Sequence, residues 1–163
     1  MRIPVLTAAA AAALATLSAA APALAREAPS AGCAALEAQA EAALGAEAVA
    51  VAASVGYPGL ADAPGCLITF SGDGTVFGTR FQAVADRLGA ALTAAGWTQD
   101  HNADADGPTG TATGYRKGGE AVAVSVAYDT PEGVCRQDAP AASCHPTAAQ
   151  MAYTITLGLR PGS

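Results

Sequence analysis

Bulky apolar residues recur at steps of three and four between residues 79 and 95, which predicts a helix with one apolar face. The positions that form this stripe are Phe81, Val84, Leu88 and Leu92. Thr79 and Gln82 have the spacing of a capping box, which satisfies free backbone donors at a helix start. Gly96 predicts the end of the helix, because glycine readily adopts the left-handed conformation found there.

A second helix is predicted over residues 33–44, where alanine and other strong helix formers dominate. One stripe of this segment consists of Leu36, Ala40, Ala43 and Leu44. Ser30 precedes the segment as an N-cap, and Gly45 follows it as a stop signal.

Several later segments alternate bulky and small side chains, as β-strands do. Residues 111–117 and 120–129 flank a Gly-Gly pair at 118–119, which supplies the positive backbone angles of a two-residue hairpin turn. Residues 151–159 alternate in the same way, with the bulky side chains at odd positions. The short apolar run at 66–70 predicts a further strand.

The pattern is weaker between these elements. Residues 47–57 fit either a continued helix or a short strand, because their valines satisfy both spacings. Residues 57–65 contain two prolines and two glycines and predict a turn-rich connection. Residues 98–110 predict a polar, acidic loop, and residues 130–149 predict a proline-containing loop.

The predicted order is helix, strand, helix, strand, strand, strand. The bulky strand faces need one apolar cover, and the helix at 79–95 supplies it. We therefore expect an α+β fold, a two-layer sandwich with a mainly antiparallel sheet of about four strands. The small-residue faces of the strands either lie against the Ala-rich helix at 33–44 or meet solvent.

The first 25 residues have the layout of a secretory signal peptide. Arg2 supplies the positive start, residues 6–21 carry no charge, and Ala23-Leu24-Ala25 has the small-x-small pattern that signal peptidase accepts. We expect cleavage there, a flexible leader at 26–32, and one small α+β domain at 33–163. The protein is then periplasmic or secreted.

A lipoprotein is the alternative interpretation of this region. Residues 30–33 loosely resemble a lipobox, in which Cys33 would become a lipidated N-terminus. Arg26 and Glu27 argue against it, because they separate the apolar region from the cysteine. Lipidation would also leave three thiols in an oxidising compartment.

An even number of cysteines follows the cleavage point, which predicts two disulfides in an exported domain. The four residues are Cys33, Cys66, Cys135 and Cys144. Cys135 and Cys144 close a short loop, so the favoured set is Cys135–Cys144 with Cys33–Cys66. A cysteine-based metal site is disfavoured, because no Cys-x-x-Cys pair is present.

Composition narrows the class of protein. Alanine accounts for 45 of the 163 residues, and only 28 bulky apolar residues remain after the signal peptide, which suits one small domain. The mature chain carries seven basic and fourteen acidic side chains, so nucleic acid is not an expected partner. No segment after the signal peptide is long and apolar enough for a transmembrane helix.

Few residues are suited to catalysis. The chain has two histidines and one lysine, and no Gly-x-Ser-x-Gly motif surrounds a serine. The aspartates, Asp100 among them, lie in or beside polar segments and are expected at the surface. We assign no catalytic residue.

The most specific local motif lies in the acidic segment before Gly107. Asn102, Asp104 and Asp106 place oxygen ligands at every second residue and match the first half of the Asp-x-Asp-x-Asp-Gly calcium pattern. The second half fails, because Thr113 stands where a bidentate glutamate belongs. A weak Ca²⁺ site is one hypothesis, and a solvated acidic surface is the other.

The loop between Cys135 and Cys144 is a candidate partner surface, through Arg136, Gln137 and Asp138.

The leading hypothesis is therefore a small exported binding or accessory protein of the cell envelope, without catalytic activity, whose partner is a protein or peptide. The alternatives are a calcium-dependent module and a small envelope enzyme of unknown chemistry.

Intact-mass measurement tests the processing and the cysteines together. We expect the exported protein to begin at Arg26 and to be four hydrogen atoms lighter than the reduced chain, two for each disulfide. A diacylglyceryl group on Cys33, or a mass that includes residues 1–25, would contradict this expectation.

Overall fold

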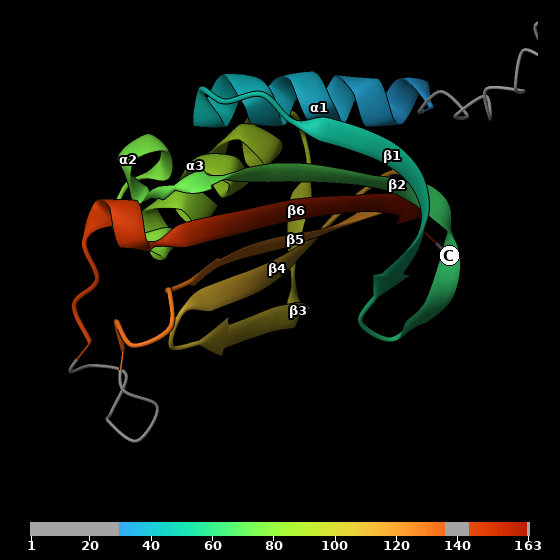
Figure 1. Cartoon of the computed structure of the whole chain (residues 1–163). Helices are drawn as coiled ribbons and strands as arrows, with labels where there is room; N and C mark the ends of the chain where they lie inside the picture. The colour runs from blue at the N-terminus through green and yellow to red at the C-terminus, as the bar shows by residue number, and fades with distance from the viewer. Residues whose placement is uncertain (1–29, 136–143, 163) are drawn as a thin grey trace, which may run out of the picture.

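The computed structural model describes residues 30–135 and 144–162. These residues form an antiparallel six-stranded sheet with two long helices on one face (Figure 1). The elements in chain order are α1 (Ala31–Leu44), β1 (Val49–Tyr57), β2 (Leu60–Asp73), α2 (Gly74–Phe77), α3 (Phe81–Ala94), β3 (Thr98–Gly107), β4 (Gly110–Lys117), β5 (Glu120–Asp129), the 3₁₀ turn η2 (Ala148–Gln150) and β6 (Ala152–Pro161).

The strands lie in the order β1-β2-β6-β5-β4-β3, and each neighbouring pair is antiparallel. The last strand of the chain, β6, enters the middle of the sheet between β2 and β5. The α+β class and the antiparallel sheet are confirmed, but the expected size of about four strands is wrong.

The two additional strands occupy the edges of the sheet. Residues 98–107 form strand β3 rather than the expected acidic loop, because an edge strand leaves polar side chains in water on both faces. A bulge between Asp100 and Ala105 also breaks the alternation that would have revealed it. Residues 49–57 form strand β1, so the helical alternative for that segment is wrong.

Strand β2 begins at Leu60, well before the predicted start at Cys66, so the turn-rich interpretation of 57–65 holds only for Pro58 and Gly59. Pro64 is tolerated in this strand because β6 pairs with β2 only from Cys66 onward. The missing backbone N–H of the proline therefore leaves no gap in the β2–β6 ladder.

Both long helices occur where the sequence predicts them. Ser30 caps α1 by accepting a hydrogen bond from the Cys33 backbone N at 3.4 Å, and Gly45 ends it with φ 67°. Gly96 follows α3 with φ 86°. The capping box is wrong, because Arg80 is the N-cap of α3 and no side chain caps it.

The hairpin between β4 and β5 is confirmed, with Lys117 paired to Glu120. Only the first glycine of its turn has a positive φ, 57° at Gly118, so the expected positive angle at Gly119 is wrong.

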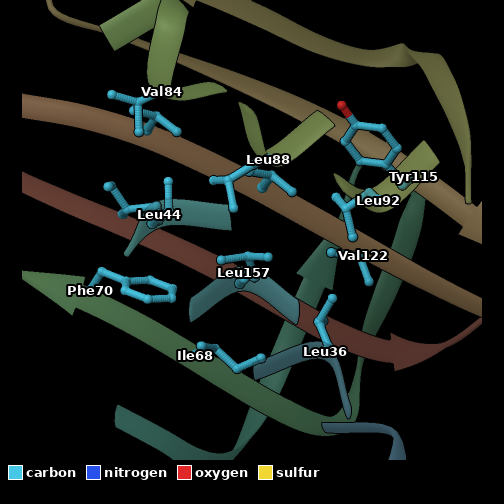
Figure 2. Packing of buried hydrophobic residues seen from close by; sticks show 14 of the residues in the cluster. Leu36, Leu44, Ile68, Phe70, Val84, Leu88, Leu92, Tyr115, Val122 and Leu157 are labelled. Carbon is cyan, nitrogen blue, oxygen red and sulfur yellow. The ribbon is translucent and has the colours of Figure 1, made fainter. Parts of the chain in front are cut away.

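The core lies between the bulky face of the sheet and both helices (Figure 2). Leu36 and Leu44 of α1 pack with Ile68 and Phe70 of β2, and α3 contributes a second row of side chains, Val84, Leu88 and Leu92. Helix α1 therefore shares the face covered by α3, so the alternative in which it covers the small-residue face is wrong. The Gln39 amide nitrogen donates to the Ala91 carbonyl oxygen and links the helices.

Both predicted disulfides are present. Cys33–Cys66 joins α1 to β2 with Cα atoms 6.2 Å apart, and Cys135–Cys144 joins the ends of the loop after β5, at 5.4 Å. Such bonds fit an oxidising, extracytoplasmic compartment. The first bond also uses the Cys33 sulfur that a lipid anchor would need.

The two disulfides should differ in their effect on stability. They span sequence separations of 33 and 9 residues, and a longer closed loop restricts the unfolded chain more. Replacing Cys33 and Cys66 by alanine should lower the free energy of unfolding by about 4 kcal/mol, and replacing Cys135 and Cys144 by about 2.5 kcal/mol. Urea unfolding of both double variants checks this; an equal or reversed loss would contradict it.

Candidate functional site

The sheet face opposite the helices carries small side chains. Strand β5 places Ala121, Ala123, Ser125 and Ala127 there, because these residues alternate with the core valines. Their cross-strand neighbours on this face include Gly114 of β4 and Gly158 of β6. Such a face has little relief and leaves room for another segment to lie against it.

The β1–β2 hairpin fills part of that room by curling over the small-residue face (Figure 1). β1 and β3 are opposite edges of the sheet, yet the Tyr57 hydroxyl at the end of β1 donates to Asp100 Oδ2 of β3 at 3.0 Å. The two edges meet through side chains without a backbone ladder, so the sheet is strongly curled but is not a closed barrel.

Two glycines permit this close approach. A Cβ atom on Gly158 would lie 2.7 Å from Cγ1 of Val55, and one on Gly114 would lie 2.5 Å from Cβ of Ala103 and against the Tyr57 hydroxyl. Real Cβ atoms do not tolerate such distances. Any larger residue at these positions would therefore push the hairpin away from the sheet.

A cavity of about 250 Å³ remains under the curled hairpin. Its walls are mostly apolar and include Val55, Leu67, Ala103, Ala112, Ala123 and Gly158. The polar groups in the wall are hydroxyls, among them those of Ser125 and Thr156, which are cross-strand partners. The wall contains no acidic, basic, histidine or cysteine side chain among the residues that the structure describes.

A charged cluster of Tyr57, Asp100 and Arg116 lies where the β1–β2 hairpin meets β3 and β4. Arg116 Nε donates to Asp100 Oδ2 at 2.7 Å, and the guanidinium carbon lies 4.8 Å from the centre of the Tyr57 ring. The Asp100 side chain is only 14% exposed. The cluster therefore joins β1, β3 and β4 by an ion pair, a hydrogen bond and a cation–π contact.

The cluster shifts the pKa of two of its members in opposite directions. Hydrogen bonds from Arg116 and then from Tyr57 lower the pKa of Asp100 to about 2. Burial, together with the hydrogen bond to Asp100, raises the pKa of Tyr57 to about 12. At neutral pH the aspartate is ionised and the tyrosine is neutral, so the cluster is a structural ion pair.

A second arginine holds the other strand of the hairpin. Arg160 of β6 is only 6% exposed, and its Nη1 donates to the Ala61 carbonyl oxygen of β2. Its Nε donates to the Pro161 carbonyl oxygen at 2.9 Å. Arg116 therefore contacts β1 of the hairpin, and Arg160 contacts β2.

The residues of the calcium hypothesis lie on β3, each with a protein partner. The Asn102 side-chain amide donates to Asp100 Oδ1 at 3.1 Å, and Asp106 accepts from the Thr111 hydroxyl at 2.7 Å. Asp104 Oδ2 lies 2.9 Å from Nδ1 of His101. Within residues 30–135 and 144–162, no three His, Cys, Asp or Glu side chains form a group suited to a metal. The calcium hypothesis stays a prediction.

The predicted partner residues Arg136, Gln137 and Asp138, and the signal peptide, lie outside the described residues. No helix of the described part has the length and apolar character needed to cross a membrane.

Sequence reasoning missed the site that the structure brings together. The sequence predicts Asp100 as a surface carboxylate, and no local motif marks Tyr57 or Arg116 as its partners. The usable signal was the run of small residues on alternate positions of β4, β5 and β6, because a sheet face without bulky side chains invites a covering segment.

Comparisons of the chain with protein-family models, with curated proteins and with solved structures find no match.

The charged cluster makes a prediction at acidic pH. The pKa of Asp100 is lower in the folded chain than its ordinary value of 3.8, so the ionised carboxylate stabilises the fold above about pH 4. This stabilisation is lost as the pH falls toward about 2. The difference in unfolding free energy between wild type and Asp100→Asn should therefore shrink across that interval, measured by urea unfolding. If this difference in unfolding free energy stayed constant across the interval, the ion pair of Asp100 with Arg116 would not stabilise the fold.

Tyr57→Phe provides the matched alkaline test. The pKa of Tyr57 is raised from 10.0 to about 12, so wild type should lose stability as the pH rises across that interval. Because phenylalanine cannot ionise, the unfolding free energy of the variant, measured by urea unfolding, should fall less than that of wild type between pH 10 and 12.

Proposed function

We propose that this chain is an exported binding protein of the cell envelope, periplasmic or secreted, that carries out no catalysis. Its site is the cavity under the β1–β2 hairpin, which receives the apolar part of a small uncharged ligand. The observation that carries the proposal is the wall of that cavity, which combines apolar side chains and glycines with a few hydroxyl groups.

The size of the cavity supports the binding of a compact group. An apolar protein cavity of about 150 Å³ accepts benzene, and typical ligand pockets begin near 300 Å³. The volume here, about 250 Å³, lies between these values. It suits a bicyclic aromatic or a short branched aliphatic group of about a dozen non-hydrogen atoms.

The polarity of the wall supports an uncharged ligand. Transfer of an unpaired charge into an apolar site is strongly unfavourable, and no charged side chain of the described residues lines this cavity. The hydroxyls of Ser125 and Thr156 offer hydrogen bonds to an alcohol, amide or carbonyl group of the ligand. The ligand is therefore expected to carry one such group on an apolar body.

The compartment is supported by two features of different kinds. The first 25 residues have the pattern of a signal peptide, and both disulfides suit an oxidising environment. A rigid, disulfide-tied scaffold also suits binding, because little chain entropy is lost when a ligand enters a preformed cavity.

2-Naphthol and 2-naphthoate are a matched pair of probes for this proposal. They share a bicyclic ring of suitable size, and only the second is charged at neutral pH. We expect 2-naphthol to bind with a Kd on the order of 0.1–1 mM, from the efficiency of small apolar ligands, and naphthoate to bind at least about tenfold more weakly. Amide chemical shifts of Val55, Ala123 and Gly158 report the binding.

A pair of variants on one strand separates the cavity from the rest of the face. Ala123→Leu fills the cavity and should abolish the shifts, whereas Ala127→Leu lies on the same face of β5 but outside the cavity wall and should preserve them. Equal binding of both probes, or retention of binding by Ala123→Leu, would overturn the proposal.

A further inference from the structure

The two edge strands of the sheet differ in how they are protected from pairing with another strand. β3 carries three aspartates and a bulge between Asp100 and Ala105. One of its backbone donors, the Asn102 N–H, is already bonded to Asp100 Oδ1 at 3.2 Å. Charges and bulges are the usual devices that block further strand addition, so β3 is a closed edge.

The opposite edge lacks these devices. Residues 49–54 of β1 contain no charged residue and no proline, and the pairing with β2 is regular until after Val55. Among the described residues, β2 is the only strand that pairs with β1. Val49 is 60% exposed, one of the few large apolar side chains left open to solvent. This edge offers about 20 Å of extended backbone.

Acidic side chains flank this edge on the helix side. Glu41 Oε1 of α1 accepts a hydrogen bond from the Ala48 backbone N at 2.9 Å, which places the carboxylate beside the start of β1. Glu37 lies one helical turn earlier on the same side of α1, and Glu47 is exposed just before the strand. Residues 30–57 contain no lysine or arginine.

We propose that the outer edge of β1 is a docking site for an extended peptide segment of a partner protein, one that alternates apolar and basic residues. Strand addition gives such a peptide its backbone hydrogen bonds. Its apolar side chains lie beside Val49 and Val51, on the face opposite the helices. Its basic side chains lie on the α1 face, beside Glu37 and Glu41.

The same charges argue against a second copy of this chain as the occupant. Pairing of β1 with the β1 of another copy would bring Glu37 and Glu41 of one copy toward the same residues of the other. Like charges across such an interface disfavour association, whereas a basic peptide is attracted.

The test uses a fluorescently labelled ten-residue peptide that alternates valine and lysine, titrated with the purified chain at low ionic strength. We expect saturable binding by fluorescence anisotropy, with amide shifts concentrated in residues 49–55. Two control peptides are N-methylated on alternate residues, each blocking one edge of the peptide. One of them should bind on the order of a hundredfold more weakly, because about three backbone hydrogen bonds to β1 are lost and each removes about 1 kcal/mol.

Matched variants test the charge component. The double variant Glu37→Gln and Glu41→Gln keeps an acceptor for the Ala48 N–H and should weaken peptide binding about three- to tenfold, as expected for two exposed charge pairs. Asp104→Asn makes one comparable charge change on β3 and should leave the affinity unchanged.

Four results would overturn the proposal. These are equal binding of all N-methylated peptides, shifts centred on β3, absence of binding, and a sedimenting dimer that Val49→Lys dissociates. The last result would assign the edge to a second copy of the chain.

Discussion

The absence of two Cβ atoms determines the shape of this protein. Gly114 and Gly158 lie on the sheet face opposite the helices, where Tyr57 and Val55 of the curled hairpin press directly against them. The hairpin reaches that position only because Gly114 and Gly158, the residues it contacts on the sheet, have no side chain. Arg116 and Arg160 then hold it through Asp100, Tyr57 and the Ala61 carbonyl oxygen. The cavity and the charged cluster both follow from this close approach.

The two faces of the sheet therefore have different physical roles. One face carries the bulky side chains, and α1 and α3 bury them in a modest core to which the Cys33–Cys66 bond adds stability. The other face carries small side chains that cannot fill the space under the hairpin, and a void persists there. The core and the cavity therefore lie on opposite faces of one sheet.

The sequence predicts the elements whose pattern is periodic: both helices, the β4–β5 hairpin, the core of β2, and β6. Strand β3 escapes prediction because an edge strand with a bulge, such as that after Asp100, has neither alternation nor apolar content. The first half of β2 is not predicted because Pro64 indicates a turn. The sequence does not show that β6 leaves this part of β2 unpaired. The cluster of Tyr57, Asp100 and Arg116 depends on curvature, which brings together residues 43 and 16 positions apart. The small residues on alternate positions of β4, β5 and β6 indicate that a segment covers that face, but they do not identify which residues meet there.

Nuclear Overhauser measurements on the methyl-labelled chain can establish whether the hairpin contacts Gly114 and Gly158. We expect cross-peaks from the Val55 methyl groups to the Gly158 α protons, and from the Tyr57 ring to the Gly114 α protons. These pairs are distant in sequence, and each pair belongs to strands that do not pair with each other. Absence of both sets, with the β1–β2 ladder intact, would show that the sheet is open and that the hairpin does not rest on these glycines.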